Sequence, residues 1–171
     1  MTVPILETPR LRLRPFAHDD VDVLYAQWTD PDVRRYLWDG RVIARDEVLA
    51  VVDESIAAFA SRGSGFWVIE IGAPPVVIGF AGLRPLPDAT DLELYYGIDP
   101  RHWRHGYATE AARAVLRYGF DVLGLDAIPI RTDGPNAASV AVMERLGACY
   151  VRTDPTGAFG TTIVYVARTA R

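Results

Sequence analysis

The sequence contains no lysine and a single cysteine, and both absences narrow what the protein can be. One thiol, Cys149, excludes an intrachain disulfide framework and argues against a cysteine-based metal site. The three histidines, His18, His102 and His105, do not form a ligand pattern, so no metal is expected. Cys149 enters an expected strand with no histidine nearby, and we expect a buried structural thiol rather than a nucleophile.

No apolar run approaches the length of a membrane span. The start of the chain, Met1–Pro4, lacks the basic region and apolar stretch of a signal peptide. Every cationic side chain is arginine, yet the net charge is −4, which disfavours a general nucleic-acid binder. These absences predict a cytoplasmic protein with neither a membrane nor a nucleic-acid partner.

The chain is long enough, and apolar enough, for one domain over residues 1–171 with a sizeable core: half of its 171 residues are hydrophobic. Period-two patterns predict strands at Leu11–Arg14, Phe66–Ile71, Val76–Leu83, Leu92–Ile98, Ile128–Thr132, Cys149–Arg152 and Thr161–Ala167, with Pro129 at an edge. Helical spacing predicts helices from His18 to Asp30-Pro31, at about Asp46–Ser61, at about Ala108–Leu123 with Gly124 as C-cap, and at Asn136–Leu146. Val33–Gly40 is expected to be a loop or short helix, and Pro85–Ala89 a loop. This order indicates a mixed α/β (α+β) domain.

The stretch Asp99–Ala111 lies between an expected strand and a long amphipathic helix. Such a junction leaves backbone N–H groups unpaired at the positive end of the helix dipole, where phosphate binds. Gly106 permits close approach of the main chain, while Arg104 and His105 can add charge. An ordinary loop with one glycine is the alternative. The sequence is neither a P-loop nor a dinucleotide fingerprint.

The segment Trp103-Arg104-His105-Gly106-Tyr107-Ala108 resembles the acyl-CoA loop of the GNAT acetyltransferase superfamily, Gln/Arg-x-x-Gly-x-Gly/Ala. Trp103 replaces the usual Gln/Arg, as in the branch that includes the ribosomal-protein alanine N-acetyltransferases (RimJ/RimL-like) and many small-molecule relatives. The Gly-Tyr-Ala-Thr-Glu-Ala of that branch stands unchanged at Gly106–Ala111. The opening Leu6–Phe16 is similar to its Thr-x-Arg-Leu-x-Leu-Arg, and Asn136–Gly147 to its Asn-x-x-Ser…Leu-Gly helix.

The resemblance covers almost the whole chain and implies a single GNAT-type domain. Its central sheet would be mixed, mostly antiparallel and of about seven strands, flanked by about four helices. The cosubstrate would be acetyl-CoA, held by Tyr96, Gly97, Ile98, Trp103, Arg104, His105, Gly106, Tyr107, Ala108, Thr109 and Asn136. The family glycine falls at Tyr95, and glycine appears at Gly97 instead. The resemblance therefore leaves open how the strand bulge is built and which amide among Tyr96 to Ile98 meets the thioester.

Two residues would serve the chemistry if the resemblance holds. Glu93, on the strand before the loop, matches a proposed general base, and its apolar neighbours would raise its pKa. A solvated or salt-bridged glutamate is the alternative. Ser139 resembles the hydroxyl that donates to the departing thiolate, and Asn136, one turn earlier, resembles the ligand of the pantetheine arm. Their alternatives are a small helix residue and an N-cap. Some relatives use a tyrosine further along this helix as the general acid. The matching position here is Met143, whose side chain has no proton to donate.

Aromatic residues follow the first expected helix, in the region that lines the acceptor site of the resembling branch. Tyr36 and Trp38 are the candidates for substrate binding, whereas Tyr25 and Trp28 are expected in the core. Asp32 or Asp39 could attract a cationic amine.

We therefore predict an N-acetyltransferase that acetylates a primary amine by direct attack in a ternary complex. The acceptor would be a protein N-terminus or a small molecule. Homodimers are common in the resembling branch, so a homodimer is one expected assembly. The alternative is a non-catalytic acyl-CoA-binding regulator of the same fold.

Overall fold

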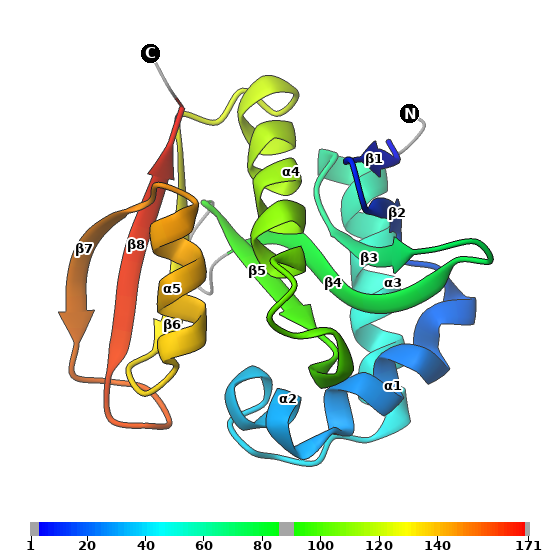
Figure 1. The fold of residues 1–171 in the computed structure, drawn as a ribbon, viewed down its shortest axis with the longest axis horizontal. Helices are drawn as coiled ribbons and strands as arrows, with labels where there is room; N and C mark the ends of the chain where they lie inside the picture. Colours follow the sequence, from blue (N-terminus) through cyan, green and yellow to red (C-terminus); the bar gives the residue numbers. More distant parts are fainter. Residues whose placement is uncertain (1–3, 86–90, 170–171) are drawn as a thin grey trace.

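The computed structural model describes residues 4–85 and 91–169, and Figure 1 shows their fold. Its strands are β1 (Leu6–Glu7), β2 (Arg12–Pro15), β3 (Phe66–Ile71), β4 (Val76–Pro85), β5 (Leu92–Ile98), β6 (Ala127–Asp133), β7 (Cys149–Asp154) and β8 (Thr162–Arg168). Its helices are α1 (Val21–Thr29), α2 (Pro31–Leu37), α3 (Arg45–Arg62), α4 (Tyr107–Asp121) and α5 (Ala137–Arg145), with 3₁₀ turns η1 (His18–Asp20) and η2 (Pro100–His102). The mixed α/β class predicted from the sequence is confirmed.

The strands form two sheets rather than the single sheet of about seven strands that was expected. One has the order β1-β2-β3-β4-β5 and the other β6-β8-β7, and every pair in both is antiparallel. The sheets part between β5 and β6, which touch without pairing. Pro129, opposite Val166 of β8, has no amide hydrogen to offer, which suits β6 to an unpaired edge. The short strand β1 is a further addition to the predicted set.

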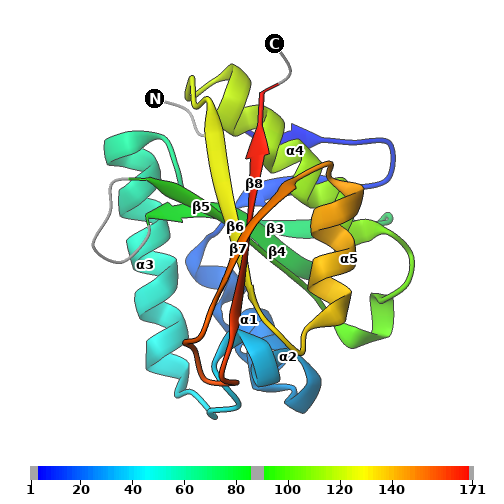
Figure 2. The ribbon, with the colours of Figure 1, turned by 90° about the vertical axis from the view of Figure 1, so that its left-hand side faces the viewer.

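Helices cover both faces of the larger sheet, with α4 on one side and α1 and α3 on the other (Figures 1 and 2). The strand side chains alternate between the two resulting cores. Trp67 and Ile69 join the core under α4, whereas Phe66 and Val68 join the core under α1 and α3. Strands β5 and β6, where the two sheets part, both contribute residues to the cleft described below.

Three local expectations are corrected. Asp30-Pro31 ends one helix but also begins α2, because the Asp30 side chain accepts the Asp32 amide at 2.9 Å and Pro31 fits a first helical position. Helix α4 ends at Asp121, and Gly124, with φ 69°, lies beyond its C-cap, Val122. Cys149 is exposed rather than buried, because β7 is an edge strand with little covering it. Of the expected loop Pro85–Ala89, Pro85 ends β4, and the rest lies outside the described residues.

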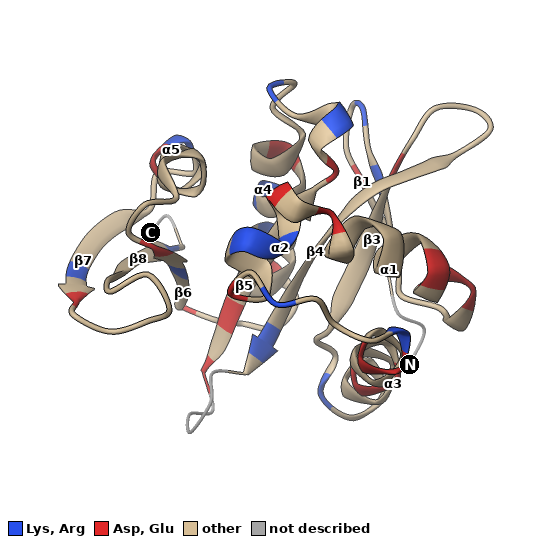
Figure 3. Ribbon diagram, turned by 90° about the horizontal axis from the view of Figure 1, so that it is seen from below, with Lys and Arg blue, Asp and Glu red and all other residues tan. Residues whose placement is uncertain are grey.

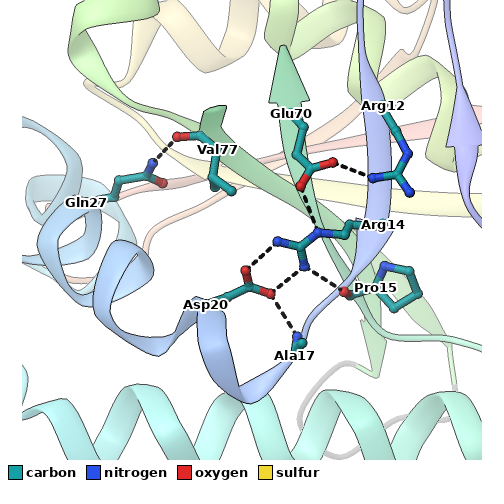
Figure 4. A network of polar contacts seen from close by, with 8 residues as sticks. All are labelled: Arg12, Arg14, Pro15, Ala17, Asp20, Gln27, Glu70 and Val77. Carbon is teal, nitrogen blue, oxygen red and sulfur yellow. Dashed lines mark hydrogen bonds and ion pairs between the residues drawn. The ribbon is translucent and has the colours of Figure 1, made fainter. Parts of the chain in front are cut away.

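A network of charges with buried carboxylates and partly exposed arginines joins β2, β3 and η1 (Figure 4). Arg14 pairs with Asp20 through its Nη2 at 2.7 Å and with Glu70 through its Nε at 2.7 Å. Arg12 adds a second contact to Glu70, and Asp20 also accepts the Ala17 amide at 2.8 Å. The hydrogen bond to Asp20 raises the pKa of Arg14 above its usual range. None of these residues lines the cleft, so the network belongs to the scaffold.

Candidate active site

One large cleft, of about 1740 Å³, opens where the two sheets part. It is lined by β5 and the start of α4 from one half of the molecule, by the end of β6 and α5 from the other half, and by α2. This volume exceeds the roughly 300–1,000 Å³ typical of a single small-molecule site. The cleft therefore has room for two ligands at once.

The loop between β5 and α4 presents the amides of a helix start to the cleft. Arg104 and Gly106 both have positive φ, 63° and 79°, and Gly106 is the N-cap of α4. Gly106, Tyr107, Ala108 and Thr109 all line the cleft. Backbone N–H groups without helical partners at such a start, together with the helix dipole, favour an anion. The predicted pyrophosphate loop therefore lies at a helix start that borders the cleft, and its ligand stays a prediction.

The opening segment of the chain holds that loop in place, a contact for which the sequence offered only a motif match. Glu110, in the first turn of α4, accepts from Thr8 Oγ1 at 2.6 Å and from Arg10 Nε at 2.7 Å. Arg10 Nη1 also donates to the His105 carbonyl at 2.9 Å, and its guanidinium lies over the Tyr107 ring, 4.8 Å from the centroid. Burial alone would raise the pKa of Glu110, but the bonds from Thr8 and Arg10 outweigh it and lower that pKa.

The α4 and α5 side of the cleft is strongly cationic. Its arginines outnumber its one carboxylate, Glu110, and are Arg10, Arg104, Arg113, Arg117 and Arg145. Arg113 is fixed by donating to the Arg145 carbonyl at 2.8 Å. Guanidinium groups recognise phosphate oxygens by paired hydrogen bonds. The donor set therefore fits a ligand with several phosphates, as acetyl-CoA has.

Of the predicted loop residues Trp103 and His105, only Trp103 lines the cleft. Trp103 donates from Nε1 to the Ile98 carbonyl at 2.6 Å, lines the cleft and remains 45% exposed. His105 does not line the cleft: its Nδ1 lies 2.7 Å from the Trp103 carbonyl and its ring stacks on Tyr107. The charge predicted from His105 beside the phosphates therefore has no support in its placement, whereas the neighbouring His102 does line the cleft.

Strand β5 crosses the floor of the cleft with Tyr96, Gly97 and Ile98 in its lining. It pairs with β4 in continuous register, Phe80 opposite Gly97 and Gly79 opposite Ile98, so the family's bulge is absent from this ladder. A Cβ on Gly97 would come within 2.6 Å of the Phe80 ring. A side chain at position 97 would therefore require the Phe80 ring to move.

Glu93 is buried, at 2% exposure, and bound to an arginine that sequence reasoning did not single out. Arg131 of β6 donates to it twice, from Nε at 2.8 Å and from Nη2 at 2.9 Å, across the line where the sheets part. This is the salt-bridged alternative considered above. Tyr95, on the same face of β5, lies close to the pair: burial and then the Glu93 charge raise its pKa to about 12. All three residues line the cleft.

Asn136 and Ser139 lie together at the start of α5, as predicted, and both line the cleft. Asn136 is the N-cap: its side chain accepts the Ser139 amide at 3.2 Å. The Ser139 hydroxyl lies 2.8 Å from that of Tyr96. Met143, one turn further, is fully buried in the core and offers no donor.

Tyr36 and Trp38, the two residues predicted to bind the acceptor amine, lie in different surroundings. Tyr36 lines the cleft, with its ring 5.3 Å from that of Phe159 in the β7–β8 loop. Trp38 does not line the cleft, because its indole packs on Trp28 in the core under α1. Trp28 itself is a core residue, as expected.

Charges of both signs surround Tyr36 at this end. Asp32 and Arg35 of α2 and Asp133 of β6 line the cleft, and burial, followed by the charge of Asp39, raises the pKa of Asp133. Seen from below, basic positions of α2 lie beside the acidic stretch of β5, which α2 contacts (Figure 3). Within residues 4–85 and 91–169 no cluster of three potential metal ligands occurs, and no helix is long and apolar enough to cross a membrane.

Comparison with known proteins agrees with this geometry. The family model described as an acetyltransferase (GNAT) domain matches residues 10–148, and the chain belongs to that family. The protein is an acetyltransferase by the same comparison. It is 33% identical over 159 residues to the FsC-acetyl coenzyme A-N(2)-transacetylase of Aspergillus fumigatus, covering 88% of this chain and 67% of that one.

Solved structures show the same fold. An acetyltransferase from Agrobacterium tumefaciens superposes with a TM-score of 0.85 at 27% identity, covering 99% of this chain and 96% of that chain. RimL, a ribosomal L7/L12 alpha-N-protein acetyltransferase in complex with coenzyme A, superposes with a TM-score of 0.82 at 17% identity, covering 96% of this chain and 98% of that one. The second likeness concerns the fold alone.

Proposed function

We propose that this protein transfers an acetyl group from acetyl-CoA directly to a primary amine while both are bound in the cleft. The observation that carries the proposal is the positive-φ loop at the start of α4, bordered by arginines and opening into a cleft large enough for two ligands. The bound acetyl-CoA supplies the activated acetyl group as a thioester.

The proposed binding residues follow from their place in the lining. The backbone of Arg104 to Thr109 holds the pyrophosphate, and the arginines of α4 and α5 neutralise the phosphates. Amides of Tyr96 to Ile98 orient the thioester, and Asn136 lies beside the pantetheine arm. Positioning of this kind accounts for much of the rate in a reaction without an acyl-enzyme.

In the transfer, a C–N bond forms, the C–S bond breaks, and the sulfur leaves with the electron pair. An ammonium group must first lose one proton to become the attacking amine. In the transfer itself the nitrogen then loses a second proton and the sulfur gains one. We assign the first proton to Glu93. Its carboxylate has four acceptor positions, of which Arg131 occupies two, so it can still accept from an amine or a water molecule. We assign hydrogen-bond donation to the departing thiolate to Ser139.

The acceptor is the less defined partner. The acidic groups Asp32 and Asp133 would attract a cationic amine, and the aromatic ring of Tyr36 would contact its carbon chain. A protein N-terminus and a small-molecule amine both satisfy this description. Among the similar proteins, RimL is named as an alpha-N-protein acetyltransferase of ribosomal L7/L12, and the Aspergillus fumigatus enzyme as an FsC-acetyl coenzyme A-N(2)-transacetylase.

The experiment that tests the proposal is a thiol-release assay with acetyl-CoA against a panel of peptides and small amines, with CoA binding measured by calorimetry. We expect CoA binding and turnover with at least one member of the panel. CoA binding without turnover on any amine would favour the non-catalytic alternative, and absence of CoA binding would contradict the assignment of the loop.

A further inference from the structure

A second hydroxyl reaches Ser139 from the opposite wall of the cleft. Tyr96 Oη, on β5, lies 2.8 Å from Ser139 Oγ and 3.2 Å from the Ser139 carbonyl oxygen, on α5. The two elements belong to different halves of the molecule, and the contact spans the gap between them. The family resemblance concerned only the backbone of Tyr96, so its side chain has no role yet.

The Tyr96 hydroxyl has two possible acceptors at Ser139 and only one proton to donate. The carbonyl oxygen, at 3.2 Å, can only accept, whereas in the contact with Oγ, at 2.8 Å, either hydroxyl can donate. The shorter distance favours Oγ as the acceptor of the Tyr96 proton. When Ser139 accepts from Tyr96, its own proton is left for another partner.

A serine in a helix often donates its hydroxyl proton to a backbone carbonyl of the same helix. Ser61 in α3 does so, donating to the Ala57 carbonyl at 2.9 Å. Among the residues that the structure describes, the Ser139 hydroxyl bonds to Tyr96 and to no carbonyl of α5. When Tyr96 is the donor, the Ser139 proton is therefore free to face the cleft, which Ser139 lines.

We propose that Tyr96 is a positioning residue for Ser139: it donates to Ser139 Oγ and so keeps the serine proton directed at the departing thiolate. The inference rests on the proposed role of Ser139. Tyr96 itself need not touch the reacting atoms. It supplies from the strand a tyrosine hydroxyl that α5 lacks at Met143.

Burial of Tyr96 supports a donor role. Desolvation raises its pKa to about 12, against a smaller lowering by the bond to Ser139. The hydroxyl thus keeps its proton throughout the neutral range, and the donation to Ser139 does not vary with pH there.

The test is a double-mutant cycle of Tyr96→Phe and Ser139→Ala, measured as kcat and KM for acetyl-CoA with an amine that is turned over. Ser139→Ala should lower kcat roughly ten- to a thousand-fold. Tyr96→Phe should lower it roughly three- to tenfold, as expected for one neutral hydrogen bond. In the Ser139→Ala background, Tyr96→Phe should change kcat no further. The CoA affinity should stay within about twofold in all variants, because the loop and Asn136 are intact.

Tyr118→Phe is the matched control. Tyr118 is also a buried tyrosine, donating to the Gly63 carbonyl at 2.7 Å, but it lies outside the cleft. It should lose a similar amount of thermal stability with kcat unchanged, which separates catalysis from packing.

The outcomes distinguish the two proposals. If Ser139→Ala lowers kcat and Tyr96→Phe does not, the inference about Tyr96 is wrong and the role of Ser139 stands. If the two effects multiply in the double variant, Tyr96 acts independently of Ser139 and the inference is also overturned. If Ser139→Ala leaves kcat intact, the proposed role of Ser139 fails, and the positioning role fails with it.

Discussion

At the end of the cleft formed by α4 and α5, the amides proposed to hold the phosphates lie in one continuous stretch of chain, residues 104–109. At the other end, the lining comes from α2, β5, β6 and the first residue of β8, segments far apart in sequence. The first end offers backbone amides at a helix start, with arginines around them. The second relies on side chains, among them the Glu93–Arg131 pair and the carboxylates of Asp32 and Asp133.

This difference explains why a sequence pattern can predict the binding site of one ligand and not that of the other. An anion held by consecutive amides needs a local pattern, in which a glycine and a helix start stand at fixed spacing. An acceptor held by scattered side chains needs only that the fold bring them together. If this comparison is correct, changes at one end should alter one ligand and spare the other.

Among the variants that test this comparison, the largest effect is expected from Glu93→Gln. We expect turnover to fall roughly a hundredfold at mildly acidic to neutral pH, where most of the amine is protonated and must lose a proton, with CoA affinity unchanged. The measurement is the pH dependence of kcat for the amine that is turned over.

A matched variant addresses the ion pair itself. Arg131→Gln alone leaves a buried charge unpaired, so the useful control is Glu93→Gln/Arg131→Gln, which removes both charges. If Glu93 removes the proton, this double variant should be as slow as Glu93→Gln alone even when its thermal stability is recovered. A pH profile of unchanged shape and height in Glu93→Gln would mean that the pair is structural.

Gly106→Val should act at the opposite end. A β-branched residue at φ 79° is strained by at least about 1–2 kcal/mol, and its side chain blocks approach to the backbone, so CoA affinity should fall roughly tenfold or more. Calorimetry with CoA measures this without any acceptor. Gly147→Val carries the same strain, at φ 75°, with open space around it and a place outside the cleft. The Gly147→Val variant should lose stability but keep its CoA affinity. Equal losses of CoA affinity in both variants would contradict the assignment of the Gly106 loop to the pyrophosphate.

The smallest effect is expected from Glu110→Gln, which weakens the contacts to Thr8 and Arg10. The CoA affinity should fall by about fivefold or less, because the ion pair is partly exposed. Since the pKa of Glu110 is lowered in the folded protein, its contribution to stability is present above the ordinary glutamate value of about 4.3 and is lost as the pH falls through the lower, folded value.

Acid unfolding measures this pH dependence. The difference in unfolding free energy between the wild-type protein and Glu110→Gln should shrink over that acidic window. A difference that stays constant down to the lowest pH would show that Glu110 does not act through its charge.

Sequence patterns predicted most elements of the fold to within a few residues, since helix and strand periods are local. They did not predict the division into two sheets, which depends on how Pro129 and the edge of β6 meet β5. The motif match likewise located Asn136 and Ser139 but not Arg131 or the hydroxyl of Tyr96. Those side chains enter the site from neighbouring strands, and no spacing along the chain encodes their approach.

Tyr36 and Trp38 illustrate the same limit in two neighbouring residues. Both are aromatic and both stand in the same stretch of sequence. The stretch was expected to be a loop or a short helix. Tyr36 lies in helix α2 and Trp38 just after it, and their side chains diverge, one to the cleft and one to the core. Residue type alone could not separate them.

The arginines around the cosubstrate end have a chemical consequence apart from binding. A guanidinium, with a pKa above about 12, holds no available lone pair at neutral pH, whereas a lysine amine does and is a common target of acetylation. Here every cation in the cleft wall is a guanidinium or an imidazole, and the sequence contains no lysine. If acetyl-CoA binds in this cleft as proposed, its thioester therefore meets no lysine side chain that it could modify.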